Sequence, residues 1–172
     1  MLRTVSIVCL CLALSVAFAA QNASREVQTY TSPDKAVVAK INFRKALDAT
    51  PESMIEISSA SGKLLMRKAY TSADGEHGYG VTEAAWTPDS RFFVYSLESS
   101  GGHQAWHSPI DFFNRSTSKV ENLDNKLNDA VMNPHFILIA PDKVTVDLYF
   151  GKKTRTVSLS ALAFNKEKRP IR

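Results

Sequence analysis

The sequence predicts an all-β protein built from repeated antiparallel units, and two observations support this prediction. A Pro-Asp turn followed by an apolar strand occurs three times, at Pro33, Pro88 and Pro141, at nearly equal intervals. Self-similarity at a nearly fixed period indicates repeated structural units. Between the turns, short runs of β-branched and aromatic residues are bounded by Gly, Ser and Asn, which is typical of strands and hairpins.

The first unit shows the plan that the others follow. Residues 27–31 form the first expected strand, and residues 36–43 form the second strand after the turn. Residues 54–58 alternate apolar and polar side chains, a period of two that predicts a half-buried strand. A polar turn then leads into residues 63–70, the last expected strand. One unit is therefore expected to contain four strands.

The second unit repeats this plan in full, and the third unit repeats it in part. The expected strands are residues 81–86, 92–97, 106–113 and 119–123 in the second unit, and 136–139, 144–150 and 154–159 in the third. Proline fixes φ for each turn, and the aspartate side chain can accept from backbone amides two residues on. Leu123, Leu127, Ala130 and Val131 fall at helical spacing, which predicts a short helix that ends before Pro134.

Units of four strands with a Pro-Asp turn between the first and second strand resemble the blades of β-propellers. The matching residues are Ser32-Pro33-Asp34, Trp86-Thr87-Pro88-Asp89-Ser90 and Ala140-Pro141-Asp142. Over residues 25–162 the chain is similar to the TolB-like, or WD40-like, Pro-Asp repeat family of exported proteins. That family commonly has Gly after the Asp, where this chain has Lys35, Ser90 and Lys143. The resemblance implies protein partners at a cell envelope.

The number of units is smaller than a closed ring requires. Closed propellers usually have at least four blades, and this chain has two units and a truncated third. We therefore predict an incomplete antiparallel β-propeller of about three blades, or the same strands repacked as a β-sandwich. Three arrangements remain open: an open fan of sheets, two chains that close one ring, or the sandwich. Exposed blade edges favour a protein partner or self-association.

The N-terminal residues have the pattern of a cleavable signal peptide. Arg3 supplies a positive charge, residues 5–16 are apolar, and Ala17-Phe18-Ala19 has small residues at the positions that signal peptidase requires. We expect a signal peptide over residues 1–19 with cleavage after Ala19, and a periplasmic or secreted protein. The expected domain spans residues 20–165, and residues 166–172 form a basic tail.

The position of the cysteines and the predicted export exclude several classes of chemistry. Cys9 and Cys11 both lie in the predicted signal peptide, so the exported chain has no disulfide, reactive thiol or cysteine metal site. The formal net charge of the full chain is +4, with much of the basic excess near the C-terminus. Nucleic acid is not an expected partner of an exported protein, and no membrane contact is expected beyond the signal peptide.

Histidines and a carboxylate lie close together in the second unit. His103, His107 and Asp111 have the same parity and would line one face of an extended strand. Two imidazoles and a carboxylate could hold a metal ion, and His77 in a Gly-rich loop could add a ligand. Residues at this spacing on a strand are too far apart to share one ion. We therefore expect no metal site and no cofactor.

A small hydrolase, metal-assisted or serine-dependent, is the alternative function. Ser99 or Ser100 would be the nucleophile and His103 or His107 the base, with the adjacent glycines donating backbone amides to an oxyanion. The chain has no Gly-x-Ser-x-Gly motif, and serine beside glycine is typical of any flexible hairpin. We assign no catalytic residue.

Recognition is the function that the residue types favour. Aromatic side chains with a polar group suit interfaces, and Gly-rich loops on a rigid β scaffold are common places for function. We predict a non-catalytic binding module that recognises a protein or another envelope ligand. Its candidate contact residues are His77, Tyr79, His103, Trp106 and His107. Trp86, directly before a turn, is expected in the core.

Overall fold

The computed structural model confirms an all-β fold with three antiparallel sheets. It describes residues 26–44, 50–102, 105–150 and 153–164. The predicted signal peptide, the basic tail and His103 lie outside the described residues. No helix in the described part of the chain is long and apolar enough to cross a membrane.

Each predicted unit forms one sheet. The first sheet contains β1 (Val27–Thr31), β2 (Val37–Phe43), β3 (Ser53–Ser59) and β4 (Leu64–Ala69) in that order. The middle sheet contains β5 (Tyr79–Trp86), β6 (Phe92–Ser99), β7 (Ile110–Asn114) and β8 (Lys119–Asn122). The last sheet has the order β11 (Lys153–Ser158), β10 (Lys143–Leu148) and β9 (Ile137–Ile139). The helices are α1 (Leu123–Leu127) and α2 (Leu159–Phe164).

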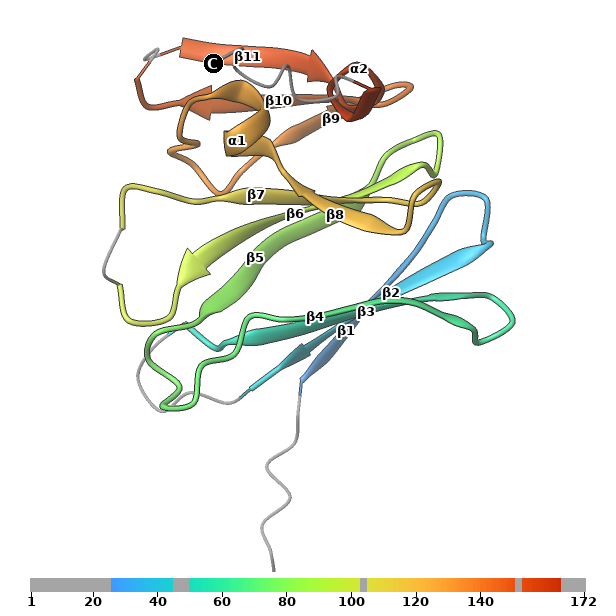
Figure 1. Ribbon diagram of the computed structural model, residues 1–172, viewed down its shortest axis with the longest axis horizontal. Coiled ribbons are helices and arrows are strands. Elements are labelled where there is room, and N and C mark those ends of the chain that lie inside the picture. The colour runs from blue at the N-terminus through green and yellow to red at the C-terminus, as the bar shows by residue number, and fades with distance from the viewer. Residues whose placement is uncertain (1–25, 45–49, 103–104, 151–152, 165–172) are drawn as a thin grey trace, which may run out of the picture.

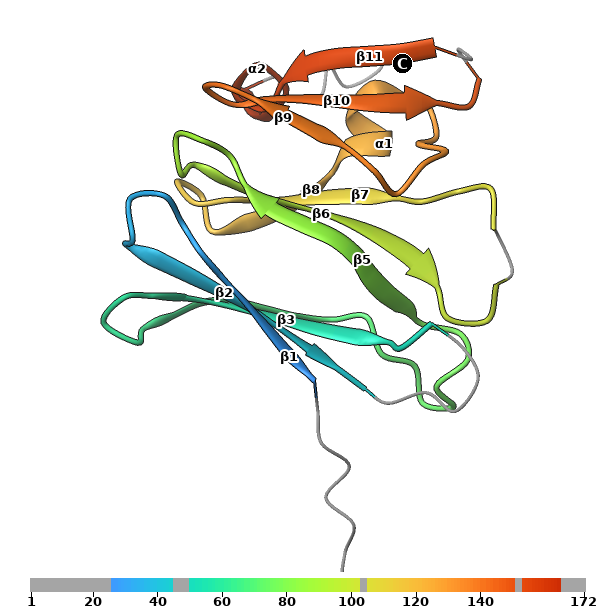
Figure 2. The ribbon, with the colours of Figure 1, turned by 180° about the vertical axis from the view of Figure 1, so that it is seen from behind.

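The three sheets are stacked face to face, with the middle sheet between the other two (Figures 1 and 2). One core cluster joins the first and middle sheets, and a second joins the middle and last sheets. Phe93 and Tyr95 belong to the first cluster, whereas Phe92 and Val94 belong to the second. Every residue of β7 is buried. The sheets therefore form an open stack rather than a closed ring.

The two outer sheets are buried on one face only. In β2 the side chains of Val37, Ala39 and Ile41 are buried, and the residues between them are more exposed. In β10, Val144 and Val146 alternate with more exposed residues in the same way. A strand with one solvated face shows this period of two, whereas a strand covered on both faces is continuously apolar. The sequence pattern of each strand thus matches its layer in the stack.

Several details differ from the sequence-based expectation. The third strand of the middle sheet begins at Ile110 rather than Trp106, because Pro109 has no amide to donate to a ladder. The short helix ends at Leu127, because Asn128 adopts the left-handed conformation of a C-cap. In the last unit α2 follows β11. Its first turn is held by Asp142, whose carboxylate accepts from the amide and hydroxyl of Ser160.

The first two Pro-Asp turns are built identically. In the first, Asp34 Oδ1 accepts from the Ser32 hydroxyl at 2.6 Å and from the amide of Ala36 at 3.0 Å. In the second, Asp89 Oδ1 accepts from the Thr87 hydroxyl at 2.7 Å and from the amide of Arg91 at 3.1 Å. A hydroxyl residue two positions before the aspartate is therefore part of the motif.

The residue after each of these aspartates adopts a left-handed backbone conformation. The φ angle is 59° at Lys35 and 63° at Ser90. A side chain costs energy in this region, which glycine enters freely. The glycine that the resembled family has after the aspartate therefore fits the conformation found here.

The three turns lie at the same side of the stack and are joined to one another (Figures 1 and 2). The amide of Asp34 donates to the hydroxyl of Ser90 at 3.0 Å. The amide of Asp89 donates to the carbonyl of Pro141 at 3.3 Å. Arg91 bridges the second and third turns through ion pairs with Asp89 and Asp142. These contacts fix how the sheets stack.

We predict that Lys35→Gly stabilises the fold. The substitution removes the side chain of an exposed residue whose backbone is left-handed, and the expected gain is about 0.5 kcal/mol after the entropy cost of glycine. Urea unfolding measures this gain. Ser90→Gly is the control, because its buried hydroxyl accepts from Asp34 and its loss cancels the gain. Equal stabilisation by both substitutions would contradict the explanation.

Candidate functional site

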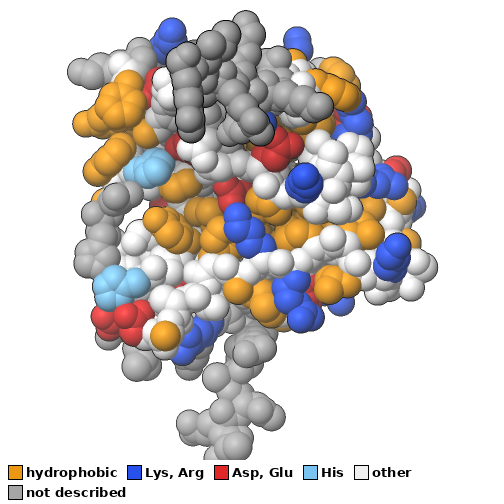
Figure 3. Space-filling model, in the orientation of Figure 1, with side chains coloured by type: hydrophobic (Ala, Val, Ile, Leu, Met, Phe, Trp, Pro, Cys, Tyr) orange, Lys and Arg blue, Asp and Glu red, His pale blue; other side chains and the backbone are white. Residues whose placement is uncertain are grey.

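Exposed aromatic side chains gather at one corner of the stack. Trp106 is 48% exposed, Tyr149 is 41% exposed and Phe150 is 73% exposed. The ring centroids of Trp106 and Tyr149 are 4.7 Å apart, and those of Tyr149 and Phe150 are 5.2 Å apart. The ring of Trp106 also stacks on His107, at 5.3 Å. We call these four residues the aromatic corner. Figure 3 shows a group of hydrophobic side chains at the end of the β10–β11 hairpin.

Hydrogen bonds from their backbone amides hold Tyr149 and Phe150 in place directly after β10. The amide of Tyr149 donates to the carbonyl of Ala130 at 2.8 Å, and the amide of Phe150 donates to Asp129 Oδ1 at 2.9 Å. The chain after α1 thus anchors the start of the hairpin turn. Because the backbone polar groups are satisfied by this neighbouring segment, the two rings can remain on the surface.

Asp124 anchors the other half of the corner. Its carboxylate lies 2.9 Å from His107 Nε2. It also accepts from the amide of Val131 at 2.8 Å and from the amide of Ile110 at 3.2 Å. One half-buried carboxylate therefore fixes the imidazole, the start of β7 and the segment that leads to the last sheet. Through the imidazole it also positions the ring of Trp106.

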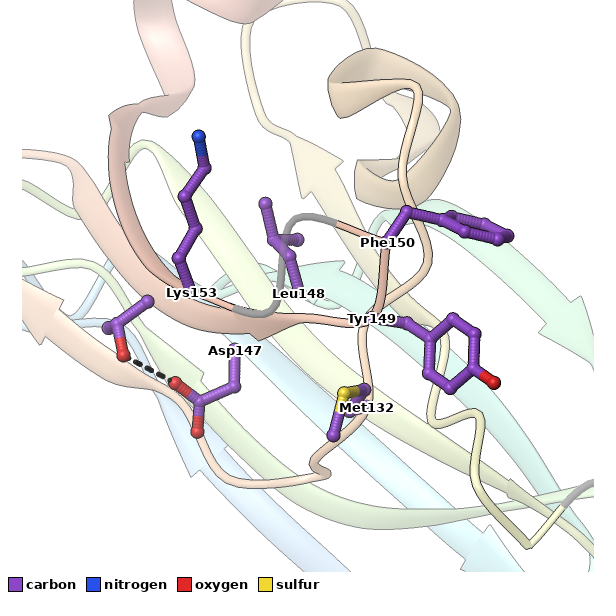
Figure 4. A pocket seen from close by; sticks show the side chains of 7 residues that line it. Met132, Asp147, Leu148, Tyr149, Phe150 and Lys153 are labelled. Atoms are coloured by element: carbon purple, nitrogen blue, oxygen red, sulfur yellow. Dashed lines mark hydrogen bonds between the residues drawn. The ribbon is translucent and has the colours of Figure 1, made fainter.

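A cavity of about 660 Å³ adjoins the aromatic corner. It is lined by Met132, Asp147, Leu148, Tyr149, Phe150, Lys153 and Thr154. Figure 4 shows Met132, Asp147 and Tyr149 on one side of the strand, and Leu148, Lys153 and Phe150 on the other. The hydroxyl of Thr154 donates to Asp147 at 2.7 Å. An apolar wall with a few polar groups is the usual composition of a binding surface.

The predicted contact residues divide between two loops. Trp106 and His107 lie in the aromatic corner, whereas His77 lies in the loop before β5, with Nδ1 2.6 Å from Asp74. Hydrogen bonds from the amide of Glu76 and from the side chains around it hold the pKa of Asp74 below its usual range. Tyr79 begins β5, half-buried against the first core cluster. That these residues bind a partner stays a prediction.

Sequence reasoning missed Tyr149, Phe150 and Met132. The segment 144–150 reads as one apolar strand, which places its aromatic residues in the core. The strand ends at Leu148, and the two aromatic residues lie in the turn that follows. Two consecutive aromatic residues directly before a Gly-Lys-Lys sequence were the available signal, because adjacent residues of a strand cannot both face the core when the sheet is covered on one face only.

The loop that carries His77 is held by a buried carboxylate, Glu52. It accepts from the amides of Ser72 and Gly78, each at 2.8 Å, and from the hydroxyl of Ser100 at 3.1 Å. Burial alone would raise the pKa of Glu52, but these hydrogen bonds, together with one from the Ser72 hydroxyl, lower it. The hydroxyl of Ser100 is therefore engaged in holding a loop. This arrangement does not support Ser100 as a nucleophile.

A second buried carboxylate, Asp111, joins the first and middle sheets. It accepts from Lys68 at 2.9 Å, from Asn122 at 2.8 Å and from the hydroxyl of Tyr70. The hydroxyls of Tyr70 and Tyr95 lie 2.8 Å apart. Burial is the largest cause of the raised pKa of both phenols, so they stay protonated. The cluster is a polar bridge within the stack.

The described residues contain no group of three or more His, Cys, Asp or Glu that could hold a metal ion. No family model matches the chain, and no curated protein matches it.

We predict that Glu52→Gln destabilises the protein by about 2 kcal/mol at neutral pH, because a charge-assisted network is replaced by a neutral amide. The folded-state pKa of Glu52 is lowered. Its contribution is therefore present above the unfolded-state value of about 4.3 and is lost as the pH falls through the folded-state value. Urea unfolding at a series of pH values should show the difference from wild type shrink in acid.

The control for this experiment is Glu56→Gln. Glu56 forms an ion pair with the exposed Arg67 at 2.6 Å on the outer face of the first sheet. Its loss should cost less than about 1 kcal/mol. Equal losses for the two substitutions would contradict the role assigned to Glu52.

Proposed function

We propose that this protein is an exported, non-catalytic recognition module that binds a protein partner through the aromatic corner. The observation that carries the proposal is the group formed by Trp106, Tyr149 and Phe150, whose rings contact one another while each is two-fifths or more exposed. Clustered Trp and Tyr side chains are enriched among the residues that dominate binding energy at protein interfaces. Exposing them in a monomer has a cost that a partner would remove.

The scaffold supports this proposal because it holds the corner rigidly. Trp106 and His107 lie in the loop that leads into β7 of the middle sheet, and Tyr149 and Phe150 lie in the turn after β10 of the last sheet. The two halves meet through the carboxylates of Asp124 and Asp129 and through the backbone of Ala130 and Val131. A preorganised surface loses little conformational entropy on binding.

Export and the TolB-like character of the module belong to the same proposal. They are supported by the signal-peptide pattern that ends at Ala19 and by the Pro-Asp turns that open the second strand of each sheet. The proposal also covers a polar ligand of the cell envelope that binds to the aromatic corner.

We predict that Trp106→Ala combined with Phe150→Ala abolishes partner capture. The test compares immobilised wild-type and variant protein in an envelope extract of the source organism, with retained proteins quantified by mass spectrometry. Truncating two central aromatic anchors should weaken binding at least 100-fold, since each is worth about 2 kcal/mol or more. The matched control is Phe164→Ala, which removes an exposed aromatic residue in α2.

A protein retained by wild type and the Phe164 variant, but not by the double variant, is the expected result. Circular dichroism of each variant checks the fold. Equal retention by all three proteins, or no retained protein at all, would contradict the proposal.

A further inference from the structure

The outer face of the last sheet carries a stripe of exposed apolar side chains. Met132 is 43% exposed, Ile137 is 64% exposed and Ile139 is 45% exposed. Their neighbours in the chain, Val131 and Leu138, point the other way and pack into the second core cluster. The three exposed residues therefore share the face that ends the stack, which is the upper surface in Figure 1. We call them the apolar stripe.

A charged row runs beside this stripe along β10. Lys143, Thr145 and Asp147 alternate with the buried Val144 and Val146, so they share the outer face with the stripe. The positive charge lies at one end of the strand and the negative charge at the other. No ion pair joins Lys143 or Asp147 to any residue that the structure describes.

The pairing between strands aligns the stripe with the charged row. Ile139 lies opposite Lys143, and Ile137 lies opposite Thr145. The amide of Met132 donates to the carbonyl of Asp147 at 3.0 Å. The stripe and the row thus lie side by side at three levels along the strands. Ile139 is beside Lys143 at one end, Ile137 is beside Thr145 in the middle, and Met132 is beside Asp147 at the other end.

The opposite end of the stack has a different surface. On the outer face of the first sheet, Glu56 pairs across strands with Lys40 and forms an ion pair with Arg67 at 2.6 Å. Packing the apolar stripe of one copy on this face would bury these charges, which is costly. A contact between two copies of the last sheet instead places apolar residues on apolar residues, and a two-fold contact closes after two copies.

We propose that two copies of this protein pack their last sheets face to face across a two-fold axis. The axis lies in the interface, perpendicular to the strands, at the level of Thr145. This operation reverses the order of the three levels. Ile137 then faces Ile137 of the second copy, and Met132 faces Ile139 of the second copy. Lys143 faces Asp147 of the second copy, so the interface contains two symmetric charge pairs.

The size of the sheet sets the strength of this dimer. Two strands of six residues and one of three cover at most roughly 20 Å by 14 Å, at about 3.3 Å per residue and about 4.8 Å per strand. Such a contact, about 280 Å² on each copy, is smaller than a standard specific protein interface, so only a weak dimer is expected. The dimer should therefore dissociate on dilution. This proposal goes beyond partner binding, because it rests on the sheet face and not on Trp106 or Phe150.

Charge reversal tests the proposed register. Lys143→Glu and Asp147→Lys each place like charges opposite one another twice, so each should weaken the dimer roughly tenfold or more. The double variant Lys143→Glu with Asp147→Lys restores opposite charges only in the two-fold register. Sedimentation equilibrium of the purified protein over a wide concentration range gives the dissociation constants.

Two further variants complete the test. Ile137→Asp should leave the protein monomeric, because it places two carboxylates against each other at the axis. Lys40→Glu, on the outer face of the first sheet, should leave the dimer unchanged. Circular dichroism checks that each variant folds. Folding is expected because substitutions at exposed positions usually change stability little.

The expected result is a wild-type dimer at high concentration, weakened by each single reversal and recovered by the double variant. A wild-type monomer at all concentrations overturns the proposal. So does a dimer that Lys40→Glu weakens as much as Lys143→Glu, or one that the double variant fails to recover. Capture of a partner protein by a monomer would leave the proposed function intact, so the two proposals fail separately.

Discussion

The structure depends on the burial of the middle sheet on both faces. Side chains of β6 alternate between the two core clusters, with Phe93 and Tyr95 toward the first sheet and Phe92 and Val94 toward the last. Neither outer sheet has another large apolar surface to cover its buried face. A sheet whose apolar face is open to water lacks the burial of apolar surface that is the dominant favourable term in folding. Each outer sheet is therefore stable because it buries its apolar face against the middle sheet. The middle sheet, in turn, is shielded from water because an outer sheet covers each of its faces.

Hydrogen bonds and ion pairs between polar side chains hold the three sheets in this stacked order. Asp111 ties the first sheet to the middle sheet through Lys68 and Tyr70, and Asp124 ties the middle sheet to the segment that leads into the last one. The linked Pro-Asp turns do the same along one side of the stack, through Asp34 with Ser90 and the amide of Asp89. Buried carboxylates are costly unless they are hydrogen-bonded, so these networks select one arrangement of the sheets. The aromatic corner exists because this arrangement brings two loops together.

The strands could be predicted because they are encoded locally, whereas the order in which the sheets stack was left open. Alternation in residues 54–58 indicates a sheet with one solvated face, and the continuous apolar run that begins at Phe92 indicates a sheet covered on both faces. The burial of Trp86 is confirmed. The partner of Trp106 could not be predicted, because Tyr149 is far away in sequence and only the stacking of two sheets brings the rings together. The role of Glu52 could not be predicted either, because its side-chain partners lie in the loop of residues 72–78 and at Ser100, both far from it in sequence.

Native-state hydrogen exchange tests the central claim most directly. If the stack depends on the middle sheet, amides in β6 and β7 should exchange only through global unfolding, with the stability that urea denaturation measures. Amides at the free edges of β1, β4 and β11 should exchange through smaller openings. Protection in β6 and β7 that matches the global stability is the result the account predicts. Faster exchange in β6 and β7 than in the outer sheets would contradict it, because the outer sheets would then be stable without their shared layer.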